Sequence, residues 1–150
     1  MSKNNSATVR IRRARPTDAA NLAALSGQLG YPTSPRQMVA RLKDALRSKT
    51  SACFVAENSG GSLLGWAHVS VTPLLEVDRR AELNGLIVEE NARSSGVGAR
   101  LLEEAEKWAK KMRCTGMSVR SNVLRERAHS FYLREGYEHY KTQKAFRKTL

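Results

Sequence analysis

Alternating apolar and polar positions predict strands in several parts of the chain. The segment 9–14, VRIRRA, alternates, and two β-rich runs, 51–57 and 63–72, flank the turn NSGGS. Period-two alternation is typical of a half-buried strand, and two such runs around a short glycine-containing turn predict a β-hairpin. Three further strands are predicted over residues 80–88, 115–121 and 137–148.

Apolar residues that recur every three or four positions predict two helices near the N-terminus. The first follows RPTD, carries Leu22, Leu25 and Leu29 on one face, and ends at Gly30. The second begins with the capping-box pattern of Ser34, Pro35 and Gln37, in which serine is the N-cap and glutamine reaches back. Its inward-facing residues are predicted to be Met38, Val39, Leu42, Ala45 and Leu46.

Two more helices are predicted in the second half of the chain. A helix of about four turns follows the 80–88 strand. Its apolar face consists of Val97, Leu101, Leu102, Ala105, Trp108, Ala109 and Met112. The last helix covers 125–136 and closes at Gly136. The order β-α-α-β-β-β-α-β-α-β predicts an α/β (α+β) fold with one mixed sheet and helices on both faces.

Length and composition are typical of one ordinary domain over residues 1–150. Neither end carries a long apolar run, so we expect no signal peptide, no membrane span and a cytoplasmic protein. Cys53 and Cys114 are expected to be reduced packing thiols. The three histidines, His68, His129 and His139, have no metal-ligand spacing, so no metal site is expected.

The formal net charge of +12 attracts anions such as nucleic acid, acidic protein or a phosphorylated cofactor. The basic residues gather in RIRRAR, KWAKKMR and KTQKAFRK, and no stacking aromatic series is interleaved with them. We therefore expect no specific nucleic-acid partner. Solvated surfaces are the alternative explanation of this charge.

A glycine-bearing loop, RSSGVG, connects the 80–88 strand to the helix that follows. Gly96 and Gly98 lie where backbone N–H groups at a helix N-terminus would be free, and the helix dipole adds positive charge there. Such a terminus is a site for an anion. The loop lacks the Gly-Lys-Ser/Thr of a P-loop and the G-x-G-x-x-G of a dinucleotide fingerprint, and a plain tight turn remains the alternative.

The same loop resembles that of a known enzyme family. The run Arg93-Ser-Ser-Gly96-Val-Gly98 after LIV matches the Q/R-x-x-G-x-G/A loop of the GNAT superfamily of N-acetyltransferases. The later family pattern is matched by Asn122, Ala128, Phe131-Tyr132 and Gly136-Tyr137. The opening VRIRRARPTDAANLAAL is also similar to the first strand and helix of that family, so the resemblance covers nearly the whole chain and implies a GNAT-like, mostly antiparallel sheet.

The resemblance implies that acetyl-CoA is bound as a co-substrate. Its pyrophosphate would lie on the 93–99 loop, with Arg100 nearby, and its pantetheine arm would run along the 86–88 strand. The cofactor-binding residues implied in this way are Leu86, Ile87, Val88, Arg93, Ser94, Ser95, Gly96, Val97, Gly98, Ala99, Asn122 and Tyr132. For Asn122, capping of the next helix is the alternative. The family also makes a homodimer plausible.

Transfer to an amine requires a base, because an alkylammonium of pKa about 10 is almost fully protonated at neutral pH. Period two puts Glu82, Asn84, Leu86 and Val88 on one strand face. Family members often carry their base at the position of Glu82, although a solvated glutamate is the alternative. The resemblance assigns the oxyanion donor to the Val88 N–H and the acid for the leaving thiolate to Tyr132, for which packing beside Phe131 is the alternative.

The sequence thus predicts an N-acetyltransferase that acts on a primary amine of a small molecule or protein. Two other functions are weighed, an acetyl-CoA sensor without turnover and a basic nucleic-acid-binding module. The segments 26–36 and 73–80 would border the acceptor, and His68 is a further substrate-binding candidate, with a surface or satisfied imidazole as its alternative. A strongly cationic acceptor such as an aminoglycoside would meet an unfavourable overall field.

Overall fold

A five-stranded β-sheet organises the chain up to Arg120. The computed structural model describes residues 8–150, which form two compact units, one up to Arg120 and one over Ser121–Leu150. The sheet contains, in this spatial order, β1 Arg10–Arg13, β2 Ser51–Glu57, β3 Leu63–Val71, β4 Arg80–Val88 and β5 Gly116–Val119. Neighbours from β1 to β4 are antiparallel and β5 runs parallel to β4, which confirms the predicted mixed, mostly antiparallel sheet.

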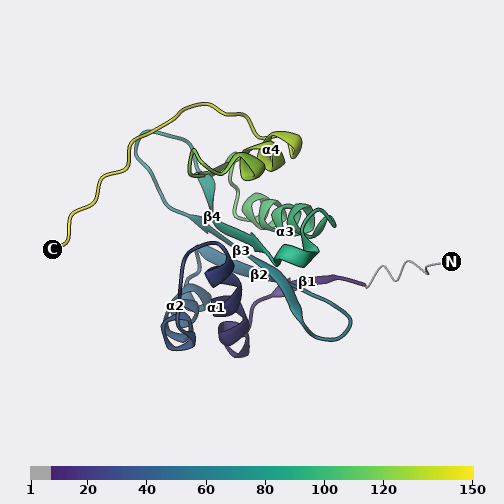
Figure 1. Ribbon diagram of the computed structural model, residues 1–150. Helices are drawn as coiled ribbons and strands as arrows, with labels where there is room; N and C mark the ends of the chain where they lie inside the picture. The colour runs from purple at the N-terminus through teal and green to yellow at the C-terminus, as the bar shows by residue number, and fades with distance from the viewer. Residues whose placement is uncertain (1–7) are drawn as a thin grey trace. The chain divides into compact units, whose positions relative to one another are not determined.

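Helices cover both faces of this sheet, as predicted. In Figure 1, α1 Ala19–Gln28 and α2 Pro35–Arg47 lie on one side of the strands, and α3 Val97–Lys111 lies on the other. Two short 3-10 helices precede longer ones, η1 Pro16–Asp18 before α1 and η2 Glu90–Ala92 before α3. The central strands therefore have a helical layer on each face.

The core divides between the two helical layers. On the α3 face, a Cβ atom at Gly65 would lie 3.1 Å from Leu101, which is fully buried. The opposite layer is a cluster in which α1 and α2 meet the sheet, and it includes Leu22, Leu25, Leu42, Cys53, Val55 and Ile87. Burial raises the pKa of the Cys53 thiol to about 11, so this cysteine stays protonated and packs as expected.

The start of α2 has the predicted capping box. The Gln37 N–H donates to Ser34 Oγ at 3.1 Å, and the Ser34 N–H donates to Gln37 Oε1 at 3.0 Å. The prediction that Val39 faces inward is wrong, because its side chain is 53% exposed. Successive residues turn by 100°, so Val39 lies about 60° around the helix from the buried Leu42, at the edge of the apolar stripe.

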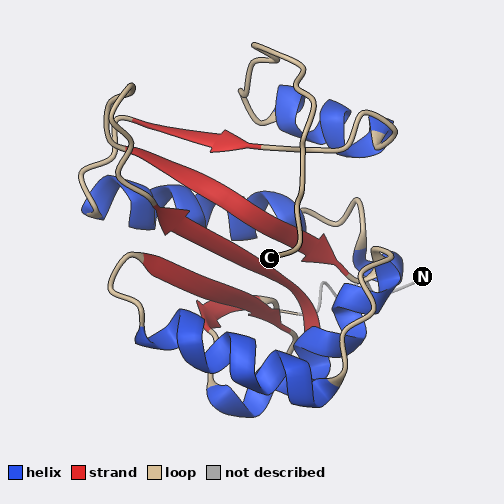
Figure 2. Cartoon of the chain, turned by 90° about the vertical axis from the view of Figure 1, so that its left-hand side faces the viewer, coloured by secondary structure: helices blue, strands red, loops and turns tan. Residues whose placement is uncertain are grey.

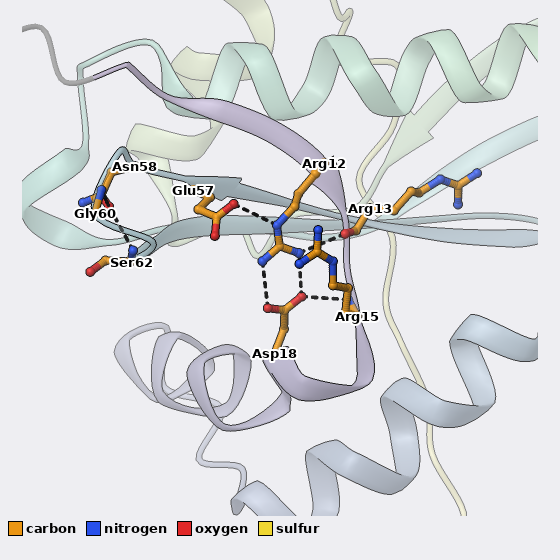
Figure 3. A network of polar contacts seen from close by, with 8 residues as sticks. All are labelled: Arg12, Arg13, Arg15, Asp18, Glu57, Asn58, Gly60 and Ser62. Carbon is orange, nitrogen blue, oxygen red and sulfur yellow. Dashed lines mark hydrogen bonds and ion pairs between the residues drawn. The ribbon is translucent and has the colours of Figure 1, made fainter.

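A buried arginine joins β1, η1 and β2 (Figure 3). Arg12 donates Nη1 and Nη2 to the two carboxylate oxygens of Asp18 at 2.8 and 2.9 Å, and Nε to Glu57 at 3.0 Å. The Arg12 and Asp18 side chains are only 9% and 8% exposed. The Arg15 N–H also donates to Asp18, at 2.7 Å. The hydrogen bond from Arg12 holds the pKa of the Asp18 carboxyl below its usual range, against the opposing effect of burial.

The second unit, Ser121–Leu150, contains the predicted helix as α4 Glu126–Arg134. The prediction of a last strand over 137–148 is wrong, because no strand or helix follows α4. The apolar residues Tyr137, Tyr140 and Phe146 are three and then six positions apart, so they define no common strand face. Tyr140 and Phe146 are 64% and 91% exposed.

Candidate active site

A β-bulge interrupts β4 at the centre of the sheet. Across the two strands, His68 pairs with Gly85, whereas its neighbour Val69 pairs with Leu83. Asn84 is therefore the extra residue on β4. A bulge shifts the alternation of side chains by one position and bends the strand locally.

The bulge overturns the prediction that four alternate residues of β4 share one face. Ile87 packs in the cluster under α1 and α2, opposite Trp66, and Glu82 projects on this same side. Leu86 and Val88 therefore turn their side chains to the α3 face. The predicted alternation continues without a break only in a regular strand, and it fails here because the extra residue moves every later side chain to the other face.

Gly85 makes room for an aromatic ring at the same point. A Cβ atom at Gly85 would lie 2.8 Å from Cζ3 and Cη2 of Trp66, so the indole ring lies directly on the glycine. A side chain at this position would have to displace the indole. The bulge at Asn84 and the Trp66 ring on Gly85 thus occupy adjacent positions of β4.

Among residues 8–150, no strand pairs with the edge of β4 beyond Leu83 on the β5 side. β5 pairs with β4 only from Arg80 to Leu83, and Figure 2 shows the two parallel strands separating towards their ends. The Glu89 N–H donates to the Leu64 carbonyl at 2.7 Å, on the β3 side. Because main-chain groups alternate in direction along a strand, those of Val88 and Leu86 point to the open edge. The main-chain groups of Ile87 point instead to β3, and its side chain lies in the core.

The predicted glycine loop begins next to this open edge and enters α3. Ser94 and Gly96 adopt positive φ angles of 63° and 87°, and Gly96 is the N-cap of the helix. The first intrahelical hydrogen bond runs from the Arg100 N–H to the Gly96 carbonyl, at 3.1 Å. The N–H groups of residues 97–99 precede this bond, so they are the donors that a helix N-terminus offers to an anion. The Ser95 hydroxyl donates to the Ala92 carbonyl.

The two arginines of the loop have main-chain partners. Arg93 Nε donates to the Val88 carbonyl at 3.1 Å and so ties the loop to the end of β4. Arg100 Nη1 donates to the Val9 carbonyl at 2.6 Å, at the start of the β1 edge. Arg100 thus ties the first turn of α3 to the β1 edge, and its position near the pyrophosphate stays a prediction.

Polar side chains gather on one part of the α1 and α2 side of the sheet, where β5 leaves β4. Glu82 accepts hydrogen bonds from Ser118 Oγ at 2.7 Å and from Arg120 Nε at 2.9 Å. Beside them, Asn84 Nδ2 donates to Ser70 Oγ at 2.8 Å. The Glu82 carboxylate is 25% exposed, so a molecule that enters this face can reach it.

His68 lies on the same face, opposite Gly85. Burial lowers the pKa of its imidazole, so the neutral form predominates at neutral pH. A neutral imidazole offers one donor and one acceptor nitrogen.

The second unit holds the other two predicted site residues. Tyr132 lies on α4, and its ring makes edge contacts with Phe131 and Tyr137 at centroid distances of 5.1 and 5.8 Å. Burial raises the pKa of the Tyr132 phenol, with a smaller opposing effect of Arg125. Asn122 Oδ1 accepts the Leu124 N–H at 2.9 Å, so this side chain closes the turn before α4, whose N-cap is Arg125.

The combination of an open strand edge, a glycine loop and a helix N-terminus can be compared with known proteins. The sequence model of the Acetyltransferase (GNAT) family matches residues 19–137. This match covers most of the chain and includes β4, the loop and α4. The chain belongs to the GNAT family.

Individual relatives agree with this assignment. The chain is 27% identical over 146 residues to aminoglycoside N(6')-acetyltransferase type 1 of Klebsiella aerogenes, covering 93% of this chain and 96% of that protein. It is 31% identical over 135 residues to the uncharacterized N-acetyltransferase YhfO of Bacillus subtilis, covering 85% and 89% of the two chains. The fold matches that of the aminoglycoside N-acetyltransferase AAC(6')-Iy in complex with CoA, with a TM-score of 0.87, 20% identity, and coverage of 99% and 100%.

As a GNAT member the chain is an acyltransferase, with acetyl-CoA as co-substrate and an amine as acceptor. Within residues 8–150, no helix has both the length and the apolar character needed to cross a membrane. In the same range, no three His, Cys, Asp or Glu side chains are grouped so that they could hold a metal ion.

Sequence reasoning missed Ser118, Arg120 and Ser70 as neighbours of the GNAT site. Period two within β5 places residues 118 and 120 on one face, and this signal is visible in MSVRS. What joins that face to Glu82 is the parallel register, in which Glu82 pairs with Ser118. The register links residues 36 positions apart, and no local pattern encodes it.

Proposed function

We propose that this GNAT protein transfers the acetyl group of acetyl-CoA to a primary amine by direct attack of the amine on the thioester. The observation that carries the proposal is the unpaired edge of β4 between the α3 N-terminus and Glu82. One end of this edge offers N–H donors for a phosphate, and the other offers a carboxylate for an amine. The two substrates of the reaction need these two kinds of group.

In the proposed complex, the pyrophosphate of acetyl-CoA accepts N–H groups of the 93–99 loop. This loop comprises Arg93, Ser94, Ser95, Gly96, Val97, Gly98 and Ala99. Support comes from the three N–H groups that precede the first helical bond, and from the helix dipole, which favours an anion at this terminus. The main-chain groups of Leu86 and Val88 that face the open edge would bind the amides of the pantetheine arm. Ile87 would support these two residues by packing. In the second unit, Asn122 is the proposed hydrogen-bond partner of a pantetheine amide.

The chemical step begins with the acceptor ammonium. Glu82 takes one proton from it, and the amine lone pair then attacks the thioester carbonyl carbon. The carbonyl oxygen becomes an oxyanion, for which the Val88 N–H is the proposed donor. Collapse of the tetrahedral intermediate breaks the C–S bond and releases the thiolate of CoA, and the nitrogen of the new amide gives up its second proton to solvent.

Tyr132 is the proposed acid for that thiolate. Burial raises the pKa of its phenol, so the hydroxyl remains protonated at neutral pH and can donate its proton. In this scheme the phenolate is re-protonated from solvent, and Glu82 releases its proton to solvent before the next turnover.

The acceptor panel begins with the amines that the relatives' names indicate. Several relatives with 25–29% identity are aminoglycoside N(6')-acetyltransferases, so aminoglycosides belong in the first assay. Amino acids, polyamines and lysine peptides complete the panel, and release of CoA is the common readout. Acetyl-CoA consumption that depends on one of these amines supports the proposal. Acetyl-CoA binding without turnover of any amine would favour a sensor.

The anion site is tested by Gly98→Asp. Aspartate is well tolerated in the first turn of a helix, so the fold should persist, while its charge and bulk oppose the pyrophosphate. We expect acetyl-CoA affinity to fall at least about tenfold by calorimetry. The exposed Ala40→Asp makes the same charge change on α2 and is the control. Unchanged affinity of Gly98→Asp would disprove this position for the pyrophosphate.

Tyr132→Phe tests the proposed acid. The substitution keeps the ring and its contacts with Phe131 and Tyr137, so stability should change little. The single-turnover rate should fall about 100-fold, because the phenol acts mainly in the transition state, and acetyl-CoA affinity should remain. A rate within about threefold of wild type would remove Tyr132 from the mechanism.

A further inference from the structure

We infer that Arg120 binds a carboxylate of the acceptor, and that the acceptor is therefore a zwitterionic amine of the amino-acid type. The inference rests on the proposed function, because it uses Glu82 as the residue that receives the acceptor amine. It goes further by naming the group that lies next to that amine. Four observations carry it, and all concern the sheet face on the α1 and α2 side.

The first observation is how the Arg120 guanidinium is used. Its Nε donates to Glu82 Oε1 at 2.9 Å, whereas the hydrogen bonds found among the described residues leave its two terminal nitrogens available. The Arg120 side chain is 82% exposed and that of Glu82 is 25% exposed. A guanidinium presents planar pairs of N–H groups that match the two oxygens of a carboxylate. Arg120 can therefore hold Glu82 through one side and a second carboxylate through another.

The second observation is that the ion pair of Arg120 and Glu82 contributes little to stability. Exposed arginine–carboxylate pairs contribute at most about 1 kcal/mol to stability. Glu82 is also oriented by the Ser118 hydroxyl at 2.7 Å, on its other oxygen, so it does not depend on Arg120 for its position. The exposed arginine is thus free to serve a ligand.

The third observation is the charge of the face. Among the described residues that β3, β4 and the β5 segment project here, Glu82 is the single carboxylate, and Arg80 and Arg120 are cations. Burial lowers the pKa of His68, so this residue adds no charge at neutral pH. Counted over these strand residues, the face is net positive, and the whole chain carries +12; Glu76 and Asp78 of the 73–80 segment share a hollow with Arg80.

The fourth observation is the short distance between the two opposite charges. The Glu82 oxygen and the Arg120 guanidinium are in direct contact, so an amine on one and an anion on the other must belong to a small molecule with a short spacer. An amino acid has this arrangement. A polycationic aminoglycoside instead needs several carboxylates for its ammonium groups, and this face supplies one that is already paired.

The experiment compares matched acceptors in the acetyl-CoA-dependent reaction. A panel of α- and ω-amino acids is assayed by CoA release, each beside its own carboxamide, together with an aminoglycoside such as kanamycin. We expect at least one amino acid to exceed its carboxamide at least tenfold in kcat/KM, mainly through a lower KM. Kanamycin should be a poorer substrate than that amino acid.

Arg120→Gln then tests the assignment to this residue. The ratio of kcat/KM for the acid over the carboxamide should fall from at least tenfold to within about threefold. Because this is a ratio of two acceptors on one variant, any effect of the substitution on Glu82 itself cancels. Arg120→Lys should keep part of the preference, since it retains the charge and loses the planar fork. Arg47→Gln, an exposed arginine at the end of α2, is the control and should leave the ratio unchanged.

The two proposals fail in different ways. If no amine in the panel is acetylated, the proposed function is wrong and the inference falls with it. If amines are acetylated but carboxamides or kanamycin are preferred, or if Arg120→Gln leaves the acid preference intact, the inference alone is wrong. Acetyl-CoA binding, measured separately by calorimetry, establishes in each case that the protein is folded and competent.

Discussion

Two arginine–carboxylate centres of residues 8–150 lie on the same side of the sheet, and they differ in burial and in geometry. At the start of the chain, Arg12 and Asp18 are 9% and 8% exposed and share two hydrogen bonds. At the junction of β4 and β5, Arg120 is 82% exposed and meets Glu82 through a single nitrogen.

The comparison teaches that burial decides what an ion pair can do. A buried arginine whose three guanidinium nitrogens all donate fixes the backbone around it, and breaking such a pair leaves a charge without compensation. An exposed pair adds little stability, and its charged groups remain available to a ligand. We therefore assign the Arg12 centre to folding and the Glu82 centre to function, and the following experiments test that division.

The largest effect is expected for Asp18→Asn, on stability. The substitution removes the charge that compensates buried Arg12, so the free energy of unfolding should fall by about 3 kcal/mol in urea titrations. The activity of the folded fraction should remain within about twofold, because the site is elsewhere in the sheet. Asp44→Asn, on the exposed side of α2, makes the same chemical change and should leave the free energy of unfolding and the activity unchanged. If the free energy of unfolding of Asp18→Asn fell by less than about 1 kcal/mol, the buried centre would be no more important for stability than the exposed one.

Glu82→Gln should lower activity strongly and change stability little, the reverse of Asp18→Asn. Loss of the proposed base should lower kcat about 100-fold near pH 7, equivalent to about 2.7 kcal/mol in the barrier. Stability should change by less than about 1 kcal/mol, since the partner arginine is exposed. Raising the pH to about 9.5 should partly restore the rate, because more of the amine is then neutral. Glu103→Gln, in an exposed pair on α3, is the control. Full activity of Glu82→Gln would assign this centre to structure.

Acid should weaken the buried centre. The pKa of Asp18 is lowered in the folded protein, chiefly by its hydrogen bond from Arg12. Its contribution to stability is therefore complete above the ordinary carboxyl value of about 4 and is lost as the pH falls through the lower folded value. Urea titrations between pH 7 and pH 2.5 should show a steeper loss in wild type than in Asp18→Asn. Parallel pH curves for the two proteins would exclude Asp18 as the source.

The smallest effect is expected for Ser34→Ala, which provides an uncharged reference. It removes the side-chain acceptor of the α2 capping box, and unfolding should become easier by about 1 kcal/mol. Activity at 25 °C should remain at the wild-type level, because a neutral local change of this size leaves almost all molecules folded. Thermal unfolding followed by circular dichroism measures the shift. A marked loss of activity would show that modest destabilisation alone disturbs the site.

Local patterns predicted most of the elements because the interactions that form them are local. The capping box of Ser34 and Gln37 spans three residues, and the apolar face of α3 repeats within each helical turn, so both are visible in the sequence. The family motifs also indicated the glycine loop and its place before α3. The prediction of the last strand was wrong because its apolar residues give no common face to bury.

The arrangement of the candidate site depended on contacts between distant residues. The sequence by itself determined the order of elements, the loop after β4 and the presence of Glu82 on that strand. Only the tertiary structure decided that Asn84 forms a bulge, which turns Leu86 away from the Glu82 face, and that β5 brings Ser118 and Arg120 to that carboxylate. The physical reason is that register and bulges are set by pairing between strands, whose partners lie tens of residues apart, whereas helix caps and side-chain periodicity are set within a few residues.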